Sequence, residues 1–97
     1  MKIWDKELLD KYIIKHTDVK IALQQWIDMV EEAEWKSHND LKKDFPSADY
    51  VGNSRYVFNI RGNNHRLVTV VVFVTGIFKI RFIGTHAEYD RVNCKLI

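Results

Sequence analysis

The stretch 55-RYVFNIRGNNHRLVTVVVFVTGIFKIRFI-83 decides the fold, because three consecutive segments of it are rich in β-branched and aromatic residues. The segments RYVFNI, HRLVTVVVFV and IFKIRFI are separated by GNN (62–64) and TG (75–76), which are typical turn residues. The pattern predicts three antiparallel strands in a meander.

Upstream of this stretch, apolar residues recur at helical spacing. A first helix is predicted over Asp5 to His16 with Asp5 as its N-cap, and a second, amphipathic helix from Thr17 or Asp18 to about Trp35. Trp26 is expected in the core, with Trp35 nearby. The segment 37–45 (SHNDLKKDF) predicts a short helix, and 47–53 (SADYVGN) an irregular connection.

Helices that precede strands indicate an α+β fold, and a chain of 97 residues accommodates one domain over 1–97. We predict two N-terminal helices packed on a small antiparallel sheet of three or more strands, followed by a short C-terminal helix. Side chains two apart in a strand share a face, so Phe78, Ile80 and Phe82 are expected to face the helices. The same alternation predicts a polar and basic opposite face that can hold an anion, formed by Asn59, Arg61, Arg66, Lys79 and Arg81.

Charge is divided unevenly along the chain. Residues 1–50 carry eight Lys/Arg against eleven Asp/Glu, whereas residues 51–97 carry seven against two. This division indicates either a polyanion-binding face or an ordinary solvated surface, and charge alone does not separate the two.

Several functional classes lack support in the sequence. Cys94 is a single cysteine, which excludes an internal disulfide and favours a reducing, cytoplasmic location. No signal peptide or membrane-spanning segment is recognisable. The four histidines have no metal-ligand spacing, and motifs for a serine nucleophile, a P-loop or a dinucleotide are absent, so neither a metal nor a cofactor is expected.

The segment 85-THAE-88 fits a capping box at the start of a short helix. The same helix start presents free amides that suit a phosphate, so a structural and a functional role are compatible. His86 at the first helical position is expected to stay neutral, because the helix dipole disfavours its protonation. Tyr89, three residues on, is expected to stack on a base, or to move a proton if cationic neighbours lower its pKa.

The segments 48-ADYVGNSRYVFNIRGN-63 and 80-IRFIGTHAEYD-90 resemble the HigB toxins of the RelE-like group, and the resemblance extends from roughly Trp4 to Asp90. It implies a RelE-like fold and an mRNA interferase that cuts messages in the 30S A site of the 70S ribosome. It also implies silencing by a HigA-type antitoxin with a helix-turn-helix, through which alone the toxin meets operator DNA.

The resemblance also implies site residues. Arg66 looks like the strand arginine that RelE-like toxins use against the phosphate, and Arg61 lies near their basic residues before the hairpin. His86 falls where RelE has an arginine, and Tyr89 falls several residues short of its terminal tyrosine, so the roles of acid and base stay open between them.

Cleavage of RNA by its own 2′-OH needs a base, an acid and cations at the phosphorane, and it does not require a metal. We expect Arg61 and Arg66 to stabilise charge and His86 and Tyr89 to transfer protons or stack on a base. RNA-binding roles are expected for Asn59, Lys79 and Arg81, whereas His65 is expected to be structural and to point to the opposite strand face. Two alternatives are a non-catalytic RNA- or ribosome-binding module and a nuclease that acts without the ribosome.

Overall fold

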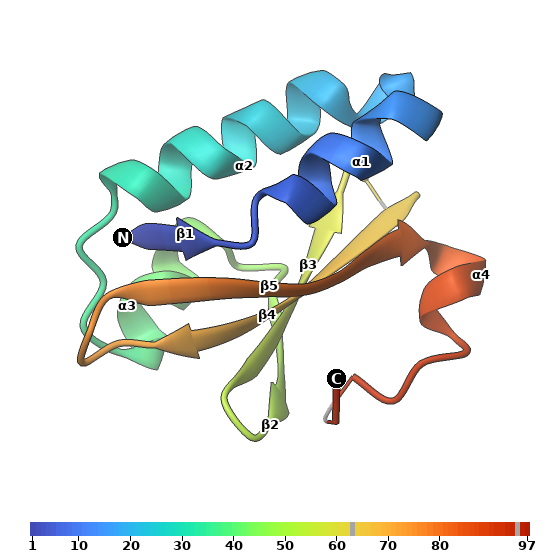
Figure 1. The fold of residues 1–97 in the computed structure, drawn as a ribbon. Helices are drawn as coiled ribbons and strands as arrows, with labels where there is room; N and C mark the ends of the chain where they lie inside the picture. Colours follow the sequence, from blue (N-terminus) through green and yellow to red (C-terminus); the bar gives the residue numbers. More distant parts are fainter. Residues whose placement is uncertain (63, 95) are drawn as a thin grey trace.

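The computed structural model describes residues 1–62, 64–94 and 96–97, and within them the chain forms an α+β fold built on one five-stranded sheet (Figure 1). The strands are β1 (Lys2–Trp4), β2 (Asp49–Gly52), β3 (Arg55–Ile60), β4 (His65–Val72) and β5 (Ile77–Thr85), and their order in the sheet is β1-β5-β4-β3-β2. The helices are α1 (Glu7–Lys15), α2 (Lys20–Glu32), α3 (His38–Asp44) and α4 (His86–Tyr89), and the 3₁₀ turn η1 (Thr17–Val19) joins α1 to α2.

The predicted meander is confirmed, since β3, β4 and β5 pair antiparallel in sequence order. The sheet around it differs from the small antiparallel sheet that the sequence predicts. The chain begins with a strand, β1, which runs parallel to β5, so the sheet is mixed. Residues 49–52, expected in an irregular connection, form the edge strand β2. Both added strands are short. Strand β1 extends the meander by pairing with β5, and strand β2 extends it by pairing with β3.

Helices α1 and α2 cover one face of the sheet (Figure 1), and the hydrophobic core lies between them and the strands. The core includes Trp26 and Trp35, as expected, and Phe58 and Phe78 from the sheet pack edge-on or tilted against these indoles. No helix in the described part of the chain is both long and apolar enough to span a membrane.

The start of α1 differs from its prediction. Asp5 is not the N-cap: it adopts a positive φ of 67°, and Lys6 occupies the cap position without a side-chain hydrogen bond. A carboxylate at the N-cap would require extended backbone there, whereas Asp5 turns the chain from β1 into the helix. The short helix after α2 is confirmed, with Ser37 as its N-cap accepting a hydrogen bond from the Asp40 amide.

A β-bulge in β5 changes which residues face the helices. Val68 pairs with Phe82, but the next residue on β4, Thr69, pairs with Ile80, so Arg81 is an extra residue in β5. Such an insertion reverses the alternation of the strand beyond it. Ile80 and Ile83 pack against the core, and Phe82 lies opposite Val68 on the other face. The prediction that Phe82 shares the face of Ile80 is therefore wrong.

Candidate functional site

Arg66 and Tyr89, two of the predicted site residues, meet on the face of the sheet away from α1 and α2. Arg66 stands on β4 between Asn59 on β3 and Gly84 on β5. Its guanidinium donates a hydrogen bond to the Asn59 side-chain oxygen and lies 5.7 Å from the centre of the Tyr89 ring. A cation over an aromatic ring is attracted to its π face, so α4 places the phenol beside the arginine.

The Tyr89 hydroxyl remains protonated at neutral pH. Burial and, after it, a hydrogen bond with the Cys94 sulfur at 3.6 Å raise the pKa of Tyr89 to about 12, and the nearby Arg66 only partly opposes both effects. A cationic neighbour is therefore present, as the sequence suggested, but burial determines the direction of the pKa shift. This phenol therefore retains a hydrogen to donate in a hydrogen bond, and it does not act as a base at neutral pH.

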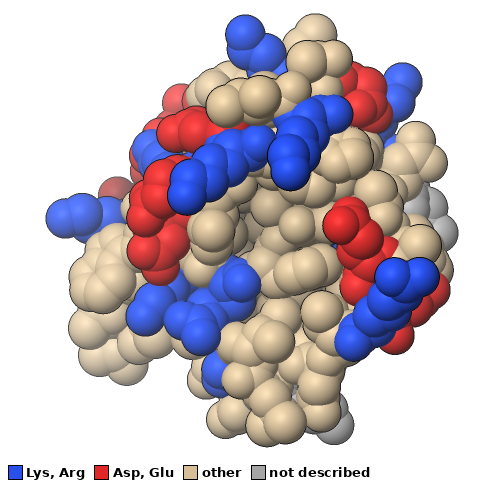
Figure 2. Space-filling view, turned by 45° about the vertical axis from the view of Figure 1, so that its right-hand side comes forward, with Lys and Arg blue, Asp and Glu red and all other residues tan. Residues whose placement is uncertain are grey.

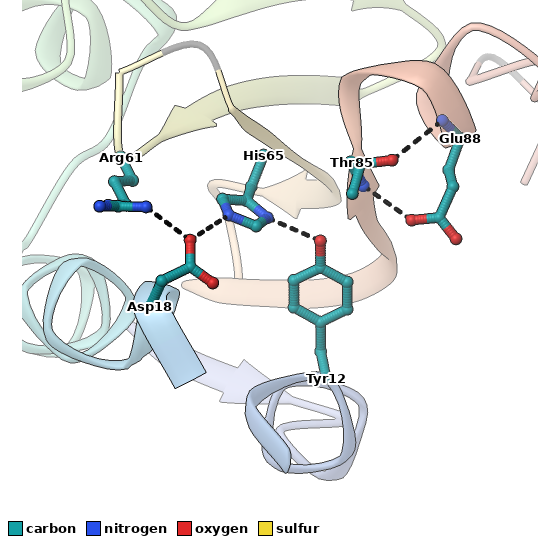
Figure 3. Close-up of polar contacts among 6 residues, drawn as sticks. All are labelled: Tyr12, Asp18, Arg61, His65, Thr85 and Glu88. Atoms are coloured by element: carbon teal, nitrogen blue, oxygen red, sulfur yellow. Dashed lines mark hydrogen bonds and ion pairs between the residues drawn. The ribbon is translucent and has the colours of Figure 1, made fainter. Parts of the chain in front are cut away.

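The predicted capping box at the start of α4 is confirmed (Figure 3). The Thr85 hydroxyl accepts a hydrogen bond from the Glu88 amide at 3.3 Å, and the Glu88 carboxylate accepts one from the Thr85 amide at 2.9 Å. The hydrogen bond from the Thr85 backbone is the largest cause that lowers the pKa of Glu88. The cap fixes the direction of α4 and thereby the positions of His86 and Tyr89.

His86 is the first residue of α4, and about half of its side chain is exposed. Its Nδ1 lies 3.2 Å from the Asp90 carboxylate, which accepts the hydrogen bond. In the neutral imidazole this contact leaves the lone pair on Nε2, so that nitrogen can act as a base. His86 and Tyr89 are three residues apart and share one side of the helix.

The predicted RNA-binding residues divide between two places. Lys79 pairs with Val70, four residues along β4 from Arg66, which places it on the same face at ~13 Å. Arg81, by contrast, occupies the bulge and lines a hollow beside α1 with Lys11 and Lys15. The bulge therefore separates Arg81 from the basic face that strand alternation predicts.

Arg61 belongs to a different cluster, on the helix-covered side of the sheet (Figure 3). Its guanidinium lies 2.7 Å from Asp18, and the same carboxylate oxygen lies 3.1 Å from Nε2 of His65. Nδ1 of His65 is 2.7 Å from the Tyr12 hydroxyl. Arg61 and Arg66 therefore face opposite sides of the sheet, and a role for Arg61 at the phosphate stays a prediction.

His65 is buried within this cluster, in agreement with the structural role and opposite face expected for it. Its hydrogen bond is the largest cause that lowers the pKa of Asp18, and burial raises the pKa of Tyr12 to about 12. Sequence reasoning missed Tyr12 and Asp18, since their partner is about fifty positions away. In the described part of the chain, no three His, Cys, Asp or Glu side chains are grouped closely enough to hold a metal ion.

Comparison with known proteins identifies relatives over nearly the whole chain. A family model described as HigB_toxin, a RelE-like toxic component of a toxin-antitoxin system, matches residues 19–92. The mRNA interferase HigB of Escherichia coli O6:H1 (strain CFT073) is 28% identical over 95 residues, which cover 96% of this chain and 92% of that protein. The mRNA interferase toxin HigB of Escherichia coli K12 is 35% identical over 88 residues, covering 88% and 80%, and the Shigella flexneri mRNA interferase HigB matches equally. The chain therefore belongs to the HigB family of RelE-like toxins of toxin-antitoxin systems.

Proposed function

We propose that this HigB-family chain is an mRNA interferase that cuts translated messages on the ribosome and thereby inhibits translation. The relatives that it matches are named mRNA interferases. The observation that carries the proposal is the contact between Arg66 and Tyr89, because it brings a cation to a protonated phenol on α4, the short helix that also carries an imidazole with an available nitrogen, that of His86. These are the groups that metal-independent cleavage of RNA needs.

In the proposed reaction, Nε2 of His86 takes the proton of the 2′-OH, and that oxygen attacks the adjacent phosphorus. Arg66, held by Asn59, neutralises the charge that gathers on the non-bridging oxygens. Tyr89 gives a hydrogen bond or its proton to the departing 5′ oxygen. The products are a 2′,3′-cyclic phosphate and a 5′-hydroxyl.

The remaining predicted residues act at a distance from the reacting phosphate. Lys79, on the same face as Arg66, is proposed to contact the RNA backbone farther along the strand. Arg61 would reach the phosphate only if its ion pair with Asp18 opened. A HigA-type antitoxin is the proposed inhibitor, the 30S A site the proposed place of action, and the cytoplasm the proposed compartment.

The test is a cleavage assay with purified protein, comparing mRNA on programmed ribosomes with the same mRNA free in solution. Arg66→Ala and His86→Ala should each lower the rate of cleavage on ribosomes by roughly 10²- to 10³-fold, because each removes charge stabilisation or proton transfer. Lys43→Ala, an exposed change on α3, serves as the control. Wild-type cleavage by both variants would remove Arg66 and His86 from the catalytic roles. Growth arrest and ribosome binding that survive both changes, without cleavage by the wild type, would instead assign the protein to the non-catalytic binding modules.

A further inference from the structure

A hollow of about 340 Å³ lies between α1 and the end of β5, on the side of α4 away from Arg66. Figure 2 shows a recessed, mostly tan surface with Lys and Arg side chains above it and to its lower left. Asp and Glu side chains lie to its right and among the basic ones at the upper left. Its basic lining consists of Lys11, Lys15, His16 and Arg81. We call these residues and the hollow between them the α1 groove.

Lys11, Lys15 and Arg81 are exposed, and within the described part of the chain none of them makes a hydrogen bond or an ion pair. Other basic residues already form ion pairs: Lys6 pairs with Glu31, and Arg61 pairs with Asp18. Like charges that make no ion pair raise the local potential and attract an anion from solution. The lining of the α1 groove carries the three unpaired cations against one carboxylate, that of Glu88, so its charge is net positive.

The arrangement follows from the sequence of α1 and from the bulge. Lys11 and Lys15 are one helical turn apart and share a face of α1 with Leu8 and Tyr12. The bulge turns Arg81 toward this face, away from the side where Arg66 stands. Leu8, Phe82 and Ile83 give the groove an apolar part. Cations beside an apolar surface suit a ligand with phosphates and flat bases.

The α1 groove and the contact between Arg66 and Tyr89 lie next to different residues of one short helix, α4. Glu88 of α4 lines the groove, while Tyr89, the next residue, contacts Arg66. The Glu88 carboxylate accepts a hydrogen bond in the capping box at the start of α4, and the residue lines the groove together with the three cations. A strand that passes around α4 would reach both sites, which favours a nucleic acid over an acidic protein segment here.

We propose that the α1 groove is a second RNA-binding site, which holds the phosphates of a single-stranded RNA segment next to the one at Arg66. It extends the proposed function, because a message held on both sides of α4 would be positioned at its scissile linkage. The binding itself requires no cleavage. The two proposals can therefore fail separately.

The test is fluorescence anisotropy of a labelled single-stranded RNA of about a dozen nucleotides, a length in the range of single-strand binding sites. The groove variant is Lys11→Ala/Lys15→Ala/Arg81→Ala. The matched control is Lys2→Ala/Lys36→Ala/Lys43→Ala, which removes equal charge from exposed positions in β1, before α3 and in α3. Melting temperatures of both variants verify folding. A third variant, Lys11→Arg/Lys15→Arg/Arg81→Lys, retains every charge.

The expected result is a loss of affinity and of salt dependence in the groove variant alone. Three phosphate contacts on a single strand change log K by about 2 per tenfold change in salt, so between about 50 and 200 mM salt the affinity of the wild type should fall about 20-fold more than that of the groove variant. The control and the charge-retaining variant should behave as the wild type does.

Three results would overturn the inference. The first is equal weakening by the groove variant and the control, which would show that only net charge matters. The second is the absence of RNA binding by the wild type at about 50 mM salt. The third is wild-type RNA binding by the groove variant together with a lost complex with the antitoxin, which would assign the groove to a protein partner. Loss of ribosomal cleavage in Arg66→Ala bears on the proposed function and leaves this inference unchanged.

Discussion

One arginine, one histidine, one tyrosine and one aspartate occur on each side of the sheet, joined in one cluster on the helix-covered side and in two separate contacts on the other. On the helix-covered side these are Arg61, His65, Tyr12 and Asp18. Both nitrogens of that imidazole have partners, its side chain is 5% exposed, and the arginine is paired with the carboxylate. Each polar group in this set is therefore occupied within the fold.

On the open side, the face of the sheet away from α1 and α2, the same residue types are Arg66, His86, Tyr89 and Asp90. Their hydrogen-bond partners and exposure differ from those on the helix-covered side. Only one nitrogen of this imidazole has a partner within the described residues, and 47% of its side chain is exposed. The arginine faces an aromatic ring rather than a carboxylate. Residue type alone does not separate a structural cluster from a reactive one. The distinction lies in whether both nitrogens of the imidazole already have partners.

The largest effect should come from His65→Ala. This change breaks the cluster on the helix-covered side (Tyr12, Asp18, Arg61 and His65), which we call the covered cluster. The change leaves a cavity and removes the partner of the Tyr12 hydroxyl and one of the two partners of the Asp18 carboxylate. We expect the free energy of unfolding to fall by ~2–4 kcal/mol, measured by urea denaturation. The matched change on the open side, Arg66→Ala, should alter the midpoint little while lowering cleavage. Equal loss of stability in the two variants would contradict the division of roles.

Tyr89→Phe should have the next largest effect, this time on the open side. The ring and its contact with Arg66 are retained, but the hydroxyl is lost. If the phenol is the acid, ribosomal cleavage should fall by about 10²-fold, which corresponds to about 2.7 kcal/mol. Because the pKa of Tyr89 is about 12, the factor should be the same at each pH around neutrality. A factor that varied with pH would show that the phenol titrates in that range.

Thr85→Ala tests how much the capping box stabilises α4, the helix that positions His86 and Tyr89. Loss of the capping hydroxyl should cost about 1 kcal/mol. For a domain of this size that corresponds to ~4–8 °C in melting temperature. Thr85→Ser keeps the hydroxyl and should melt with the wild type. If both variants melted alike, the capping box would not contribute to stability.

The local features of the molecule could be predicted from the sequence, whereas the features that depend on distant pairing could not. The capping box at Thr85 and the meander are set by residues close in the chain, so their patterns are legible. Strand β1 has three residues, and its partner Ile77–Lys79 lies some 75 positions away. The bulge at Arg81 has no glycine or other local signal, so strand alternation misplaced Phe82. Sequence reasoning assigned Arg61, Arg66 and Tyr89 to one site. Arg66 contacts Tyr89, whereas Arg61 lies on the other side of the sheet, paired with Asp18.

Acid should weaken the covered cluster through Asp18. Its pKa is lowered in the folded chain, first by the hydrogen bond from His65, so the ionised carboxylate contributes stability above the unfolded pKa of about 3.9. That contribution is lost as the pH falls through the lower, folded value. Asp18→Asn should therefore melt below the wild type at neutral pH, and the two curves should converge in acid. Glu34→Gln, at an exposed position outside the cluster, is the control.

Arg61→Ala should give the smallest effect. It tests most directly whether Arg61 acts only within the covered cluster or also at the phosphate with Arg66. The Arg61 side chain is 53% exposed, and ion pairs of that kind contribute ~0–1 kcal/mol, so thermal melting should change little. His65 continues to bond Asp18, which keeps the carboxylate partnered. Ribosomal cleavage should stay within about threefold of the wild-type rate, which corresponds to ~0.7 kcal/mol or less of transition-state stabilisation. The effect is small because the Arg61 cation faces away from the reacting phosphate. A loss of 10²-fold with unchanged melting would mean that the Asp18 pair opens on the ribosome and that Arg61 joins Arg66 at the phosphate, as the resemblance to RelE-like toxins implies.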